Sequence, residues 1–261
     1  MRVAIMQPYF LPYIGYFQLI ASADLFIVYD NIKYTKKGWI NRNRMVQNGK
    51  DVLFSLPLKR DSDFLSVCDR EIASDFDSKK LLRQFAGAYR DAPYIEQTLP
   101  LIEDIVKHAD MNLFQFVHNS IVKICRHLEI QTVIKKSSEV PIDHELKSQE
   151  KVLALCNKVG ATTYINSAGG IELYSESAFH AQNIDLRFIR SKSFQYSQFG
   201  SEFIPWLSIV DVLMFNPREH IRQAIHENYD LFSPSNGSLE FEQLIDTKLP
   251  MAEGKYEQQR N

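Results

Sequence analysis

The sequence predicts an α/β fold: a Rossmann-like parallel sheet with a helical insertion in the middle third of the chain. Three observations predict it. Short apolar runs alternate with helical patterns near the amino terminus, the middle third shows helical spacing throughout, and the alternation returns in the last third. Such alternation is typical of βαβ units that build a parallel sheet.

The opening residues carry the clearest βαβ unit. Residues 3–6 (VAIM) predict a buried strand, which Gln7 and Pro8 end. Pro12 can open a helix because its fixed φ suits the first helical turn. Residues 25–28 (LFIV) predict the second strand. Because ligands favour the carboxyl ends of such strands, we expect a site directly after the first one.

The remaining elements follow from the same patterns. Helical spacing predicts a helical block at residues 78–128, in which Asp110 is the N-cap of the last helix. Residues 30–44 predict a long functional loop with a short hairpin, and Gly160 closes a helix. We expect a single α/β domain at 1–245 and a polar tail at 246–261. The other predicted strands are 51–58, 131–135, 162–166 and 184–189, and the other predicted helices are 149–159, 204–215 and 217–227.

Composition excludes several classes of protein. Hydrophobic residues make up 45% of the chain and charged residues 24%, which argues against disorder. Thirty Lys and Arg against 32 Asp and Glu give a net charge of -2, so a bulk electrostatic attraction to nucleic acid is not indicated. No stretch reaches the roughly 20 apolar residues of a membrane span. We expect no membrane partner.

Cysteine usage predicts a reducing compartment. The three cysteines lie far apart, and no pair has the spacing of a metal site. The amino terminus lacks the apolar run of a signal peptide. These features predict a cytoplasmic protein with buried free thiols and no metal.

The turn after the first strand is the first candidate site. It reads QPYFLPYIGY and includes Gln7, Tyr9, Tyr13, Gly15 and Tyr16. A strand that leads into a helix N-terminus offers free backbone N–H groups to an anion. The YIGY segment resembles the His-x-Gly-His segment of cytidylyltransferases, pantothenate synthetase and class I aminoacyl-tRNA synthetases, with tyrosine in place of both histidines. The resemblance implies that fold and a phosphate-bearing ligand more than it implies nucleotidyl-transfer chemistry.

The segment that follows the second strand is the second candidate site. Asp30 ends the strand, and the next residues include Trp39, Asn41, Arg42 and Arg44. Arginine binds phosphate or carboxylate in a planar fork, and tryptophan offers a stacking face. This mixture predicts a functional loop, although a solvated basic loop is the simpler alternative.

These segments together resemble the opening of the WbqC-like protein family. The resemblance includes QPYFLPYIGYFQLI, Asp30 and the WINRNR run, and it continues with Tyr164, the SAGG loop, FQYSQ and WLSIVDVLMFN, over about residues 1–228. It implies a bacterial protein encoded with enzymes of O-antigen and other surface-polysaccharide synthesis. For relatives, a role in glycine transfer to an amino sugar has been suggested.

The third candidate site lies in the last third of the chain. Ser167, Gly169 and Gly170 form a predicted loop whose backbone amides can hold an anion in a nest, and Tyr174 follows it. Asp211 lies in an apolar helix, where a carboxylate is costly unless it is paired or faces a site. Structural roles stay open as alternatives for all these residues.

The lead hypothesis is a transferase of O-antigen, and hence lipopolysaccharide, precursor synthesis. It would move an acyl or aminoacyl (glycyl) group to the amine of a nucleotide-linked sugar, with Asp30 or Asp211 as the base. The acyl donor and any cofactor stay unspecified; nucleic acid is expected to take part only as a tRNA donor. The alternatives are a nucleotidyltransferase-like or adenylate-forming enzyme and a non-catalytic module that binds nucleotide or RNA.

Overall fold

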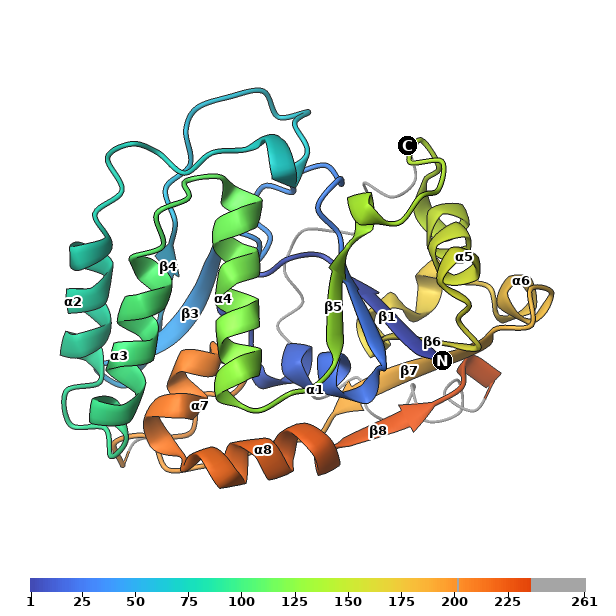
Figure 1. Cartoon of the computed structure of the whole chain (residues 1–261). Helices are drawn as coiled ribbons and strands as arrows, with labels where there is room; N and C mark the ends of the chain where they lie inside the picture. Colours follow the sequence, from blue (N-terminus) through green and yellow to red (C-terminus); the bar gives the residue numbers. More distant parts are fainter. Residues whose placement is uncertain (201, 236–261) are drawn as a thin grey trace.

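Six strands form the central sheet in the order β5-β2-β1-β6-β7-β8 (Figure 1). The computed structural model describes residues 1–200 and 202–235. All neighbouring pairs run parallel except β7 and β8, which run antiparallel. The strands are β1 Arg2–Met6, β2 Leu25–Val28, β5 Val133–Lys136, β6 Thr163–Ser167, β7 Asp185–Ser191 and β8 Tyr229–Phe232. The α/β class with a mostly parallel Rossmann-like sheet is confirmed.

Apolar side chains on the two faces of the sheet enter two separate cores. Alternate residues of β1 show this: Ala4 joins one core and Val3 and Ile5 the other. The first core packs against α1 (Ile14–Ser22), α4 (Leu113–His127), α7 (Ile209–Phe215) and α8 (Arg218–Glu227). The second packs against α5 (Ser148–Val159) and α6 (Glu176–His180). The sheet is therefore the middle of three layers.

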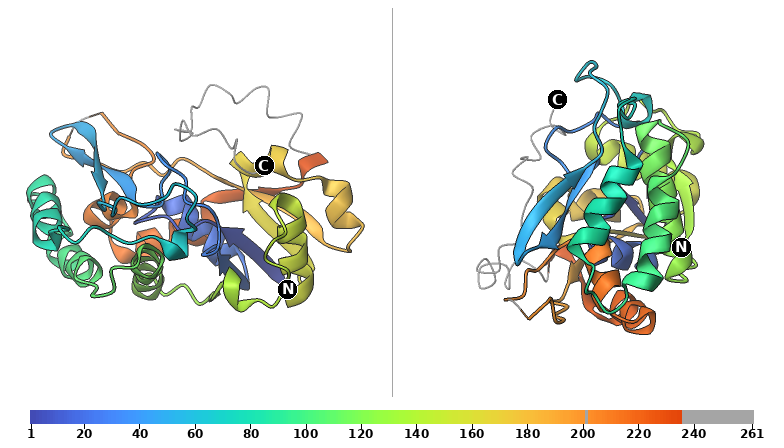
Figure 2. Two further views of the ribbon diagram at one scale, coloured as in Figure 1. Left: turned by 90° about the horizontal axis from the view of Figure 1, so that it is seen from above. Right: turned by 90° about the vertical axis from the view of Figure 1, so that its left-hand side faces the viewer.

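The chain between β2 and β5 forms the predicted insertion. It contains a hairpin, β3 (Arg42–Gln47) with β4 (Lys50–Ser55), and helices α2 (Ser78–Ala88), α3 (Ile95–Val106) and α4. Asn48 and Gly49, both with positive φ, make the hairpin turn. Figure 2 shows the hairpin and these helices gathered on one side of the sheet, with α5 and α6 on the other. Three short 3₁₀ helices, Val67–Asp69, Ser137–Glu139 and Ala168–Leu173, complete the described elements.

Most predicted elements are confirmed to within a few residues, and four details are corrected. Asn112, not Asp110, caps α4, because its side chain accepts from the N–H of Gln115. The predicted helix at 204–215 begins only at Ile209, since Trp206 has a φ of 60°. Ser167 ends β6, and the rest of the SAGG segment begins a 3₁₀ helix where a loop was expected. The predicted loop ends at residue 41, because residues 42–44 belong to the first strand of the hairpin. The predicted tail lies outside the described residues.

Candidate functional site

The candidate site lies at the carboxyl edge of the parallel sheet. From β1 the chain leads to β2 on one side, and β6 pairs with β1 on the other. The strand order therefore reverses between β1 and β6, and open α/β sheets bind ligands at such a point. Gln7 follows β1 here, and Ser167 ends β6. Both predicted segments thus reach the same edge.

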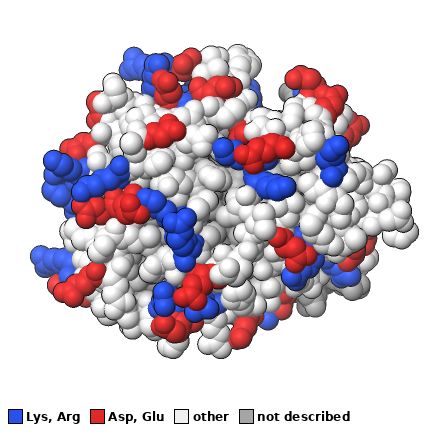
Figure 3. Space-filling view, viewed as in Figure 1, with Lys and Arg blue, Asp and Glu red and all other residues white. Residues whose placement is uncertain are grey.

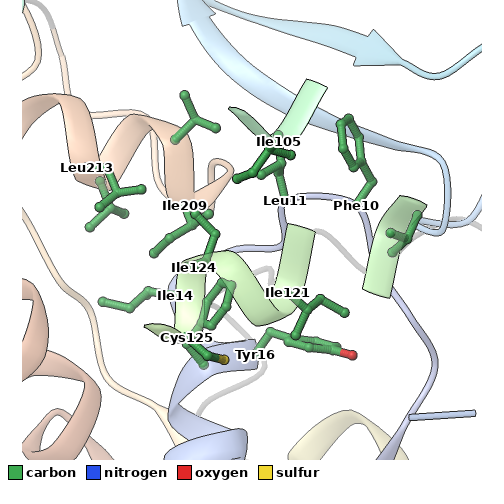
Figure 4. Close-up of a cluster of buried hydrophobic side chains, with 14 of the residues drawn as sticks. Phe10, Leu11, Ile14, Tyr16, Ile105, Ile121, Ile124, Cys125, Ile209 and Leu213 are labelled. Atoms are coloured by element: carbon green, nitrogen blue, oxygen red, sulfur yellow. The ribbon is translucent and has the colours of Figure 1, made fainter. Parts of the chain in front are cut away.

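Tyr16 fixes the shape of the β1–α1 turn. Its hydroxyl donates to the carbonyl oxygen of Gln7 at 2.8 Å, and its ring packs near Tyr9 with centroids 5.6 Å apart. Only 3% of Tyr16 is exposed, and burial raises its pKa well above the ordinary value. Figure 4 shows its ring next to Ile121 of α4, inside the core. Tyr16 therefore supports the turn from within, while Gln7 stays partly exposed.

Gly15 lets α1 start against the end of β7. A Cβ atom at this position would lie 2.3 Å from Cε2 of Tyr13 and 2.4 Å from Oγ of Ser191. Real Cβ atoms do not approach other atoms so closely, so a side chain here would displace its neighbours. The glycine thus allows the segments after β1 and β7 to meet.

Hydrogen bonds from Asn43 tie the hairpin to the β1–α1 turn. Its Nδ2 donates to the carbonyl oxygens of Phe10 and Leu11 at 3.2 and 3.0 Å. Asn41, a predicted ligand residue, accepts from the Tyr34 hydroxyl and donates to the Leu56 carbonyl oxygen, each at 2.8 Å. The oxygen and the nitrogen of the Asn41 side-chain amide are therefore both engaged within the protein, and the residue has a structural role in this conformation.

Two arginines of β3 flank the ring of Trp39. The guanidinium carbons of Arg42 and Arg44 lie 6.0 and 5.9 Å from the ring centroid, within range of cation–π attraction. Arg44 pairs with Asp51 at 2.7 Å and donates to the Trp206 carbonyl oxygen at 3.4 Å. Its Nε is buried and has no hydrogen-bond partner among the described residues. Arg42 instead donates to the carbonyl oxygens of the segment before it.

Charge on the face seen in Figure 3 is mixed. Basic and acidic side chains are interspersed on this face, without a large region of one sign.

Asp30 lies at the carboxyl edge, where its carboxylate accepts hydrogen bonds from two serines. It accepts from Ser137 Oγ at 2.7 Å, from the Ser138 N–H at 2.9 Å and from the Ser138 hydroxyl. Burial raises its pKa, but the hydrogen bonds from Ser138 and Ser137 outweigh this and hold the pKa below its ordinary value. Asp30 is therefore ionised near neutral pH and is a weak base.

Lys151 and Asn31 extend this network. The Lys151 amine lies 3.4 Å from the Asn31 carbonyl oxygen and 3.2 Å from that of His144. Burial lowers the pKa of Lys151, and the charges of Asp30 and Glu145 oppose this shift. The hydrogen bonds of Asp30, Asn31 and Lys151 therefore join the ends of β2 and β5 to the start of α5.

Asp211 belongs to a different cluster. It is fully buried in α7 and accepts from Tyr89 at 2.8 Å, Tyr196 at 2.6 Å and Gln198 at 2.7 Å. Burial raises its pKa, and the hydrogen bonds from Tyr196 and Tyr89 work against that shift. Asp211 and Asp30 share no hydrogen-bond partner in the described part of the chain. The two predicted bases therefore do not form a pair.

The segment after β6 is closely packed against its neighbours. Gly170 lies so close to Asn166 that a Cβ would be 2.7 Å from its Nδ2. Neither Gly169 nor Gly170 has a positive φ, which the αR–αL form of a nest requires. The Tyr174 ring packs edge-on against Tyr164, with centroids 5.5 Å apart.

The structure thus brings together one part of the predicted set, namely Tyr13, Gly15, Trp39 and Arg44, near Trp206. The Tyr13 and Trp206 rings lie 6.0 Å apart, and Arg44 contacts the Trp206 backbone. Asn43 lies in the WINRNR run of the predicted site but was not predicted as a binding residue, and Trp206 was missed. Asn43 alternates with the two arginines, which is the signal that could have placed it on the opposite face of a strand.

Within residues 1–200 and 202–235, no group of three or more His, Cys, Asp or Glu side chains is placed to hold a metal ion. The same described residues contain no helix long and apolar enough to cross a bilayer.

Comparison with known proteins identifies the family. The model of the WbqC-like protein family matches residues 7–223, and the chain belongs to this family. It is also similar to an uncharacterized protein of Mycobacterium tuberculosis, Rv1507c, with 28% identity over 220 residues that cover 82% of this chain and 93% of that protein. No solved structure matches the chain significantly. The turn and the hairpin described above both fall within the family match.

Proposed function

We propose that the protein is a transferase of surface-glycan precursor synthesis that acts on a nucleotide-linked sugar. The observation that carries the proposal is the placement of Trp39 and Arg44 beside the β1–α1 turn. Asn43 holds β3 to this turn, and the Ser208 N–H donates to the Arg44 carbonyl oxygen at 2.9 Å. A stacking face and a cation therefore stand next to the helix N-terminus at the switch point of the sheet.

The diphosphate of the ligand is assigned to the space between the start of α1 and Arg44. Arginine is suited to phosphate because its N–H groups form a planar fork. The Nε–H of Arg44 is buried and has no hydrogen-bond partner among the described residues, so it can donate to a phosphate if the side chain rotates away from Asp51. The sugar then extends along the carboxyl edge towards Gln7 and Asp30.

We assign the amino group of the sugar to Asp30. Its hydrogen bonds from two serines keep the carboxylate ionised, which suits it to attract an ammonium group more than to remove a proton from it. The reaction in this proposal is acyl or aminoacyl transfer to that amine, as the family resemblance implies. The ammonium loses a proton to solvent, its nitrogen forms the amide bond to the acyl carbon, and the bond from that carbon to the donor breaks, so that the donor's activating group leaves. The donor is an activated acyl compound or an aminoacyl-tRNA.

Calorimetry against a panel of nucleotide-linked sugars tests the proposal. We expect sugars with a free amine to bind more tightly than their hydroxyl counterparts, and Arg44→Gln to weaken all of them about tenfold or more. Arg83→Gln is the matched control, since Arg83 is exposed on α2 and pairs only weakly with Asp77 at 3.6 Å. Mass spectrometry of the sugar after incubation with acyl donors then detects the product. Failure of every member of the panel to bind would refute the proposal.

Nucleotidyl transfer is the second candidate function, and one contact favours it. The Arg190–Ser193 segment meets the β1–α1 turn at Gly15, where a Cβ would touch Ser191. The segment is basic and contains serine, so its contact with the turn that resembles that of nucleotidyl-transfer enzymes supports phosphate binding there. Tyr13 and Tyr16, which replace their histidines, are neutral and argue against it. Pyrophosphate release from ATP or CTP in the presence of an acid or a sugar phosphate would favour this function.

A further inference from the structure

An aromatic pocket lies beside the start of α1. Its lining comes from α1, from the chain after β7 and from the chain before α7, and the open space among these residues, including the part that joins the solvent, is about 370 Å³. Five of the eleven residues that line it are aromatic. The aromatic residues are Tyr13, Phe194, Tyr196, Phe203 and Trp206.

The walls of this aromatic pocket are held in place. The Tyr196 hydroxyl donates to the buried Asp211 at 2.6 Å, and its ring packs edge-on against Phe203 with centroids 5.2 Å apart. Ser208 donates through Oγ to the Leu11 carbonyl oxygen at 2.6 Å, so the chain that carries Trp206 is fixed to the β1–α1 turn. Asp211 thus acts in the pocket as a positioning residue, and a rigid wall lowers the entropy cost of binding.

Two cations lie near the aromatic pocket. Lys192 belongs to its lining and pairs with Asp230 at 2.7 Å. Arg44 lies outside the lining but donates to the carbonyl oxygen of Trp206, which belongs to it. A pocket of aromatic rings with cations nearby favours a planar group that carries an anion, because stacking and charge act together. An acyl chain would use neither feature.

We propose that the aromatic pocket binds the nucleobase of the nucleotide-linked sugar, with its diphosphate between the start of α1 and Arg44. This inference rests on the proposed function and adds the orientation of the ligand to it. The base stacks among the rings near Trp206, and the sugar points away towards the carboxyl edge. Because stacking depends little on the identity of the base, the pocket tolerates more than one nucleotide.

Intrinsic fluorescence provides the test, since the chain has two tryptophans and both belong to the site. The Trp39→Phe variant leaves Trp206 as the reporter. We expect UDP, CDP, ADP and GDP to change its emission with saturation, and inorganic pyrophosphate to bind about tenfold more weakly because it cannot stack. Phe203→Leu keeps bulk without a ring and is expected to weaken UDP about tenfold while leaving pyrophosphate binding unchanged. Phe64→Leu is the control, because Phe64 is 81% exposed and outside the pocket.

The outcomes separate the two proposals. Equal affinity for UDP and pyrophosphate, with no effect of Phe203→Leu, would overturn the inference but leave the proposed function standing if nucleotide-linked sugars still bind. An equally strong response to glucosamine 1-phosphate, lost in Phe203→Leu, would place the sugar in the pocket and also overturn it. Failure of nucleotides and nucleotide-linked sugars alike would refute both.

Discussion

Gly15→Ala is expected to destabilise the protein and to disturb the aromatic pocket. The added Cβ would lie 2.3 Å from Cε2 of Tyr13 and 2.4 Å from Oγ of Ser191, so both side chains must move. Overpacking of this kind lowers the free energy of unfolding by about 1–3 kcal/mol. Replacing a helical glycine with alanine raises it by up to about 1 kcal/mol, because alanine has the higher helix propensity. We therefore expect a net loss of about 1–2 kcal/mol. The displaced Tyr13 ring packs on Trp206, so the emission of Trp206 should also change.

Gly87→Ala is the matched control for this substitution. Gly87 lies in α2, and a Cβ there would meet nothing within 4 Å. Only the gain in helix propensity remains, so we expect this variant to be more stable by about 0.5–1 kcal/mol. Urea unfolding of both variants, with Trp39→Phe as the common background, measures the two free energies and the emission of Trp206. A Gly15→Ala variant as stable as Gly87→Ala, with unchanged emission, would refute the steric argument.

Three further substitutions test the hydrogen-bond networks. The folded protein lowers the pKa of Asp30, so the stabilisation that its carboxylate provides is present above the unfolded pKa and is lost as the pH falls. Asp30→Asn should therefore lose stability relative to the wild type as the pH rises. Thermal unfolding of both proteins between about pH 3 and 7 measures this difference. Burial raises the pKa of Asp211, so the opposite pH dependence is expected: Asp211→Asn should gain stability relative to the wild type as the pH rises over the same range. If the stability of the two variants relative to the wild type changed with pH in the same direction, the assigned pKa shifts of both aspartates would be contradicted. Asn43→Ala leaves two backbone carbonyls without their donor and should cost about 1–3 kcal/mol in urea unfolding, whereas Asn157→Ala, at an exposed position, should change little.

Local patterns predicted much of the fold because the forces behind them act within a few residues. The apolar run of β2 matches the observed strand, and Gly160 ends α5 with a φ of 72° as its lack of a Cβ allows. The prediction was wrong at 204–208, where apolar residues suggested helix. Their burial arises from contact with the β1–α1 turn, and the Ser208 hydrogen bond to Leu11 there joins residues 197 apart in the sequence.

By itself, the sequence determined the family and the α/β class, since these depend on motif and on local periodicity. Only the tertiary structure decided the environments of the two predicted aspartates. The serines that donate to Asp30 lie about a hundred positions further along the sequence, and Tyr89 donates to Asp211 across a sequence separation of 122 residues. Because a pKa depends on burial and on such distant partners, one carboxylate is held ionised and the other is enclosed. The packing of Tyr13 on Trp206, which builds the aromatic pocket, was likewise decided by the fold.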